Sequence, residues 1–86
     1  MSISDGNYNR ARAILVAAGS NTAAKSHDKH TKGKGSPEGH GVSLLQEARD
    51  EFQANDAGGE DLQAGMTGDH YNAIHSAADQ MGITSW

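Results

Sequence analysis

The chain has 86 residues, 35% of them hydrophobic, with no cysteine and a net charge of −4. A chain of this length forms one domain, residues 1–86, with a small core, because it buries only about 60–65% of the surface that its unfolded form exposes. The lack of cysteine excludes disulfides and thiolate zinc sites, and no apolar run approaches the roughly 20 residues of a membrane span.

Charge is divided along the chain. Up to Gly41, six bases stand against three acids, a net charge of +3. From Val42 onward, one base stands against eight acids, a net charge of −7. A chain divided in this way is able to bind a second copy head to tail, or to offer its basic half to an acidic or phosphate-bearing partner.

The first predicted helix runs from about residue 7 to residue 18. Ser4 or Asp5 is expected to cap its start, and Gly19 stands where a left-handed residue ends many helices. Its apolar side chains recur at helical spacing, which predicts that one face is buried. These side chains are Tyr8, Ala11, Leu15 and Ala18.

Residues 20–41 hold no large apolar side chain and carry the single proline of the chain at position 37. The first part, residues 21–32, is able to extend as a polar helix. The glycine-rich part, residues 33–41, is expected to have no regular structure. We therefore predict a long polar loop or arm over residues 20–41.

The second predicted helix begins at Ser43. Gln46 completes a capping-box pattern with it, and the glycine-rich run 55–59 ends the helix. One short helical turn is expected between residues 60 and 66. The third predicted helix covers about residues 70–81, with Thr67 or Asp69 as its cap and Gly82 at its end.

These elements predict an all-α fold, a small three-helix domain with a long polar Gly/Lys/His-rich loop between helices 1 and 2. The same segment is the candidate partner-binding arm. Lys25, Lys29 and Lys32 follow helical spacing and Lys34 comes next. Nucleic acid is disfavoured, because the net charge is negative and no aromatic residues alternate with the lysines. An acidic protein surface is the favoured partner of the arm.

Two further sets of residues are candidates for partner contact. Phe52 and Trp86 are large apolar side chains suited to a protein interface, and the tryptophan either folds onto its own core or inserts into a partner. An acidic face is predicted from six residues that follow one another in the second half of the chain. They are Glu47, Asp50, Glu51, Asp56, Glu60 and Asp61.

The side chains of types that bind metals or catalyse reactions form no complete site. His27 and His30 with Asp28 are an incomplete ligand set, so no metal and no cofactor are expected. Asp69–His70 and the acids near residue 50 form no nucleophile–base–orienter set, so we predict no catalytic residues and no enzyme. The N-terminal segment lacks the basic region of a secretory signal, which favours a protein that is cytoplasmic or incorporated into a virion.

The leading hypothesis is a non-enzymatic structural or interaction protein, a small subunit of a larger assembly such as a phage virion accessory or lattice component. It docks through the basic arm and the apolar C-terminal anchor onto other protein subunits, of its own kind or foreign. One alternative is an acidic inhibitor that blocks the nucleic-acid site of another protein. The second alternative is a small nucleic-acid binder that uses the lysine stripe.

Overall fold

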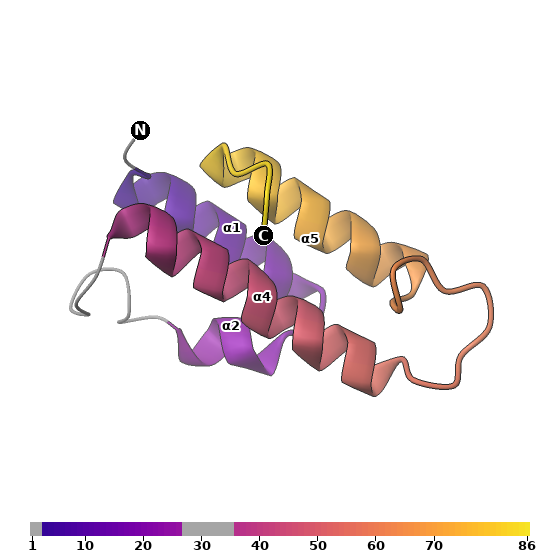
Figure 1. Cartoon of the computed structure of the whole chain (residues 1–86). Coiled ribbons are helices and arrows are strands. Elements are labelled where there is room, and N and C mark those ends of the chain that lie inside the picture. Colours follow the sequence, from indigo (N-terminus) through magenta and orange to yellow (C-terminus); the bar gives the residue numbers. More distant parts are fainter. Residues whose placement is uncertain (1–2, 27–35) are drawn as a thin grey trace.

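A computed structural model describes residues 3–26 and 36–86 of the chain. Within these ranges it has four helices, α1 (Asp5–Ala17), α2 (Asn21–Lys25), α4 (Pro37–Asn55) and α5 (Gly68–Met81). α1 packs chiefly against α5, and the short α2 packs against both α1 and α4 (Figure 1). The predicted all-α class is confirmed for the described residues, which include no β-strand. None of their helices is long and apolar enough to cross a membrane.

The long loop predicted over residues 20–41 is not confirmed, because helices occupy both of its ends. Residues 21–25 form α2, and α4 begins at Pro37 rather than at Ser43. The Ser36 side chain accepts the N–H of Gly39 at 3.0 Å and so caps the helix. Proline suits the first helical position, because a backbone N–H there would have no partner within the helix. The predicted capping box at Ser43 is therefore wrong. Residues 27–35 lie outside the described residues.

Close packing explains why α4 contains a glycine in its first half. Gly41 is buried, and a Cβ atom there would lie 2.6 Å from Ile83 Cδ1 and 2.7 Å from Ile3 Cδ1. Glycine is a poor helix former, but here its missing side chain lets segments from both ends of the chain pack onto α4. Tertiary packing thus overrides local propensity at this position.

The predicted ends of α1 and α5 are confirmed. Ser4 and Thr67 cap their starts, each through a side-chain oxygen that accepts a backbone N–H. Both helices are followed by a glycine in the left-handed region, Gly19 with φ 103° and Gly82 with φ 69°. After Gly82, the N–H of Ile83 donates back to the last turn of α5 at 2.9 Å, as in a Schellman motif.

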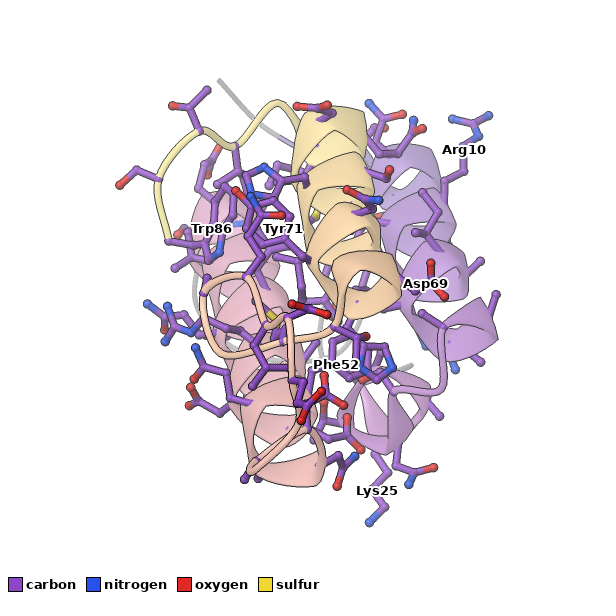
Figure 2. The ribbon with its side chains drawn as sticks, turned by 90° about the vertical axis from the view of Figure 1, so that its right-hand side faces the viewer. Arg10, Lys25, Phe52, Asp69, Tyr71 and Trp86 are labelled. Carbon is purple, nitrogen blue, oxygen red and sulfur yellow. The ribbon has the colours of Figure 1, made fainter. Side chains whose placement is uncertain are left out.

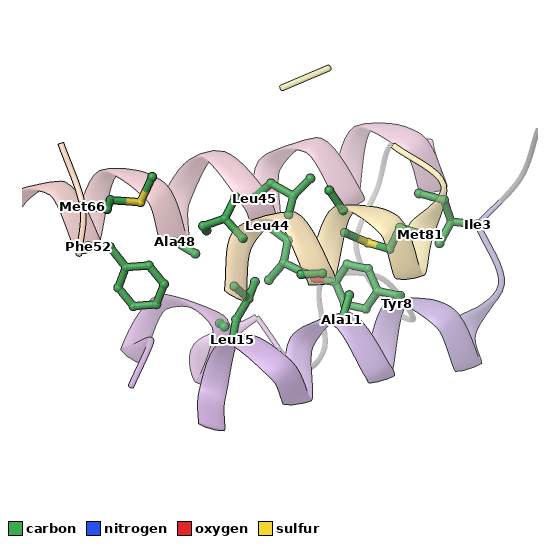
Figure 3. Close-up of a cluster of buried hydrophobic side chains, with 14 residues drawn as sticks. Ile3, Tyr8, Ala11, Leu15, Leu44, Leu45, Ala48, Phe52, Met66 and Met81 are labelled. Atoms are coloured by element: carbon green, nitrogen blue, oxygen red, sulfur yellow. The ribbon is translucent and has the colours of Figure 1, made fainter. Parts of the chain in front are cut away.

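The core lies between α1, α4 and α5 (Figure 3). Its largest fully buried apolar side chains are Tyr8, Phe52, Leu15, Leu44, Leu45 and Ile74. Alanines fill much of the remaining interface, with Ala11, Ala48 and Ala77 fully buried. Small side chains at these contacts let the helices approach closely, so that a chain with few large apolar residues still reaches a close-packed interior.

The connection between α4 and α5 contains a tight turn instead of the predicted short helix. Gln63 and Met66 exchange two backbone hydrogen bonds, at 2.8 and 3.0 Å. Between them Ala64 has φ 52° and Gly65 has φ 81°, as in a type I′ turn. The Gln53 side chain donates to the Ala64 carbonyl at 2.8 Å and ties the turn to α4.

We expect Ala64→Asn to stabilise the protein by about 0.5–1 kcal/mol. Asn adopts positive φ more readily than Ala, and Asn-Gly is the preferred pair in type I′ turns. Urea denaturation of the variant and the wild type measures the difference. Ala54→Asn, at an exposed helical position of α4, is the matched control and is expected to lower stability by about 0.5 kcal/mol. Equal losses in both variants would contradict the turn assignment.

Gly41→Val is expected to lower the free energy of unfolding by about 1–3 kcal/mol, because the added side chain overlaps Ile3 and Ile83 in a packed interior. The control is Gly68→Ala at the start of α5, where a Cβ atom would meet nothing within 4 Å. That change is expected to be neutral or to stabilise by up to about 1 kcal/mol. Wild-type stability in the valine variant would show that the two terminal segments do not pack on Gly41.

Candidate functional site

A charged groove lies between α2 and α4. It encloses about 520 Å³, and its described lining consists of Thr22, Lys25, Ser26, Glu47, Asp50 and Glu51. The groove brings the first lysine of the predicted basic arm together with three residues of the predicted acidic face. Lys25 is exposed at the end of α2, whereas Ser26, next to it, is buried. The groove is therefore an open surface whose lining residues carry both signs of charge.

Glu51 fixes α2 in this groove by capping its first turn. Its carboxylate accepts hydrogen bonds from the Ser20 hydroxyl at 2.7 Å and from the backbone N–H groups of Asn21 at 2.9 Å and Thr22 at 3.2 Å. Burial alone would raise the pKa of Glu51, but the bonds from Ser20, Asn21 and Thr22 outweigh it and hold the pKa below its ordinary value. The negative charge is thus kept at the helix N-terminus, where the peptide dipoles favour it.

Arg12 secures the other end of α2. Its guanidinium donates to the carbonyl oxygens of Ala23 and Ala24, both at 2.9 Å. These carbonyls belong to the last turn of α2, where the Ala23 oxygen also accepts the backbone N–H of Ser26 at 3.1 Å and its hydroxyl at 2.7 Å. A helix of five residues is too short to be stable alone, so α2 exists because Glu51 from α4 and Arg12 from α1 hold its two ends.

A second polar cluster joins the end of α4 to the start of α5. His70 Nδ1 lies 2.7 Å from Asp56 Oδ2, which also accepts the N–H of Thr67 at 2.9 Å. The His70 ring stacks on Phe52 with centroids 3.9 Å apart and planes 6° from parallel. The hydrogen bond from His70, followed by that from Thr67, lowers the pKa of Asp56.

A carboxylate–imidazole pair orients the general base of many active sites. In this chain the partner of His70 is Asp56 rather than Asp69, the neighbour singled out in the sequence, and Asp69 is exposed. The bond to Thr67 and the stacking on Phe52 both connect α4 with α5. We therefore assign the Asp56–His70 pair to the fold.

The predicted partner-binding residues are distributed as follows. Lys25 lies at one end of the molecule, away from Trp86 and Tyr71 (Figure 2). Lys29, Lys32 and Lys34 lie outside the described residues. Phe52 has no exposed surface, so its side chain is part of the core and is not available to a partner.

Trp86 lies against its own chain and is half-buried. Its ring stands edge-on to that of His75, with centroids 5.2 Å apart, and His75 is tilted against Tyr71 at 4.3 Å. Tyr71 is also half-buried and packs on the core, whereas His75 is exposed. His75, which itself contacts Tyr71, is thus the aromatic side chain of α5 that meets Trp86, and we call this position the seat of Trp86.

The predicted acidic face is not continuous. Its six residues are divided among the groove wall (Glu47, Asp50, Glu51), the end of α4 (Asp56) and the exposed α4–α5 connection (Glu60, Asp61). Glu51 and Asp56 are engaged in the bonds described above. Asp50 is exposed, and its carboxylate lies 3.3 Å from the guanidinium of the adjacent Arg49.

Little in the sequence indicated the bonds that build the site. Arg12 and Ser20 carry no motif that links them to the ends of α2, and Glu51 lies 29 to 31 residues beyond its partners. A serine after Gly19 was the one available signal, because serine after a helix-ending glycine often caps the next helix. Among the described residues no three His, Asp or Glu side chains are grouped to hold a metal ion. His27 and His30 lie outside them.

Glu51→Gln is expected to destabilise the protein by about 1–2 kcal/mol at pH 7, because the charged acceptor of several hydrogen bonds is lost. The pKa of Glu51 is lowered by folding, so its contribution is complete above about pH 4.5 and disappears as the pH falls through the folded-state pKa. Urea denaturation at pH 7 and pH 3 measures both effects. The wild type and Glu51→Gln should differ less at pH 3.

The matched control is Asp50→Asn, which removes the same charge one residue away at an exposed position. It should change stability by less than about 0.5 kcal/mol. Equal losses for the two variants, or a difference at position 51 that does not depend on pH, would contradict the capping role of Glu51.

Compared with protein-family models, with curated proteins and with solved structures, the chain gives no significant match. Its function is therefore inferred from its own residues. Two surface features offer a basis for this, the mixed-charge groove between α2 and α4 and the seat of Trp86 on α5.

Proposed function

We propose that this chain is a non-enzymatic interaction protein, a small subunit that acts by binding other protein chains in a larger assembly. The observation that carries the proposal is the mixed-charge groove, whose lining includes Lys25 together with Glu47 and Asp50. In a two-fold dimer the same patch of both copies meets, so a patch with both signs of charge offers each copy an opposite charge to pair with. A second copy of the same chain is therefore the partner that this patch suits best.

Contact between two such patches pairs the lysine of each copy with the acidic wall of the other. Lys25 and Asp50 are exposed, so their charges are accessible at the surface. Lys29, Lys32 and Lys34 follow Lys25 in the sequence and lie outside the described residues. Glu51 and Arg12 keep α2 in place, so the relative position of the two charge signs is fixed before binding, which reduces the entropy lost on association.

The two alternatives are less favoured. An acidic inhibitor would present a run of carboxylates as a phosphate mimic, but Glu51 and Asp56 are bonded within the fold. A nucleic-acid binder would use the lysines without the acids. A virion accessory or lattice component is one setting for the proposed assembly subunit.

The proposal predicts association that weakens with salt. Light scattering after gel filtration should give a mass above that of one chain at about 50 mM salt and a lower mass at about 500 mM, because salt screens exposed charges. Lys25→Asp and Asp50→Lys should each reduce the mass at low salt. The double variant Lys25→Asp, Asp50→Lys should restore it, because the exchanged patch is again self-complementary.

The matched control is Asp79→Lys, which makes the same charge change at an exposed position of α5 and should leave association unchanged. A single-chain mass at both salt concentrations would exclude self-association and direct the search to a foreign partner. Duplex DNA added to that monomer then tests the nucleic-acid alternative. DNA binding that is lost on changing Lys25, Lys29, Lys32 and Lys34 to Gln would replace the present proposal.

A further inference from the structure

α2 contributes little to the core that holds the other helices together. Ala23 is its one buried apolar side chain, whereas α1 buries Tyr8, Ala11 and Leu15. α2 lies at the edge of the bundle, where it packs against α1 and α4 and has no contact with α5 (Figure 1). An element with few buried apolar contacts is able to open while the rest of a protein stays folded.

Two side chains from outside α2 supply the bonds that its own packing does not. Arg12 from α1 donates to two carbonyl oxygens of its last turn. The Glu51 carboxylate from α4 accepts four hydrogen bonds from residues 20–22. A guanidinium keeps its charge in acid, whereas a carboxylate is neutralised there. The two ends of α2 are therefore held by groups that respond differently to pH.

We infer that Glu51 is an acid-sensitive latch, and that α2 unfolds locally when this carboxylate is protonated while α1, α4 and α5 stay packed. A neutral carboxyl group is the weaker acceptor, because hydrogen bonds to an ionised group are roughly twice as strong as neutral ones. It also brings no negative charge to the N-terminus of the helix. With five residues, α2 lacks the helical length that would compensate for this loss.

Release of α2 removes one wall of the mixed-charge groove. Thr22, Lys25 and Ser26 line the groove from the α2 side, and a folded α2 is what holds them beside α4. The latch is thus a means of regulating association through the groove, and this consequence rests on the proposed function. Copies that associate through the groove at neutral pH are expected to separate in acid.

The charged groups around Glu51 respond to acid in other ways. Arg12 on α1 and Lys25 on α2 stay positive, and Glu47 and Asp50 on α4 lose their charge at the groove wall. The cap on the first turn of α2 is Glu51. Burial raises the pKa of Glu51, but the bonds from residues 20–22 outweigh it and lower the pKa below 4.5. The latch is therefore complete above that pH and opens as the pH falls through the folded-state value.

NMR on the full chain separates local release from global unfolding. It is recorded at about 500 mM salt, where exposed charges are screened and copies are kept apart. The α2 reporters are the backbone N–H groups of Ala23 and Ser26, which are bonded within the α2 segment. The core reporters are those of Leu45 and Ala77, residues buried in α4 and α5. Glu51→Gln at neutral pH imitates the protonated latch.

In Glu51→Gln the amide exchange rates of the α2 reporters should rise about tenfold or more, because a charged hydrogen-bond acceptor is lost. Their Cα chemical shifts should move toward coil values, while the core reporters keep theirs. The matched control is Asp50→Asn, which should leave all four reporters unchanged. Wild type should follow the Gln variant below about pH 4.5. Acid also weakens the Asp56–His70 link, since the pKa of Asp56 is lowered too, so the variant at neutral pH is the deciding comparison.

Three results would overturn the inference. The first is a helical α2 in Glu51→Gln. The second is a loss of protection in the α2 and core reporters together, which would show that α2 and the core unfold as one unit. The third is an equal effect of Asp50→Asn, which would show that the loss of any nearby charge is sufficient.

Light scattering of Glu51→Gln at about 50 mM salt, where exposed charges are weakly screened, distinguishes failure of the latch from failure of the proposed function. Released α2 together with a lower mass than wild type supports both. Released α2 with the wild-type mass above one chain would show that the groove is not the interface, so the latch stands and the proposed function fails. Retained α2 with salt-dependent association of the wild type would leave the proposed function standing and the latch refuted.

Discussion

The carboxylate of Glu51 is the interaction on which the arrangement of this small protein depends. It reaches from α4 to the first turn of α2 and accepts hydrogen bonds from a hydroxyl and from backbone N–H groups. Arg12 reaches from α1 to the last turn of the same helix. Since α2 has only five residues, these two side chains replace the helical length that it lacks. They join three helices that share few large apolar contacts.

The rest of the fold also holds together with few large apolar side chains. The core relies on alanines and on a buried glycine to bring α1, α4 and α5 close together. Side-chain hydrogen bonds then join the ends of neighbouring helices. One of them, between His70 and Asp56, links the start of α5 to the end of α4. Side chains of a type often found in active sites are used here as links between helices. This use favours an interaction protein over an enzyme as the proposed function.

The two surface features differ in their physical nature and therefore in their expected behaviour. The groove between α2 and α4 offers charges at the surface, which act at a distance, are screened by salt and favour rapid association. The seat of Trp86 offers aromatic contacts that act only at short range.

Local sequence was sufficient to specify the parts of this protein that depend on neighbouring residues. Ser4, Thr67, Gly19 and Gly82 specify the ends of α1 and α5 through local backbone bonds, and the apolar spacing specifies which faces are buried. Local patterns misplaced the start of α4, because a serine–proline pair outside the apolar pattern sets it and packing at Gly41 tolerates the glycines that follow.

Only the tertiary structure decided which charged and aromatic residues work together. Glu51 bonds to residues about 30 positions away, and Asp56 meets His70 because an intervening turn reverses the chain. Such pairings depend on distances in space that composition and periodicity do not encode. Phe52 illustrates the difference, since the sequence suggested it for partner contact, whereas its complete burial beneath His70 followed from how α4 and α5 pack.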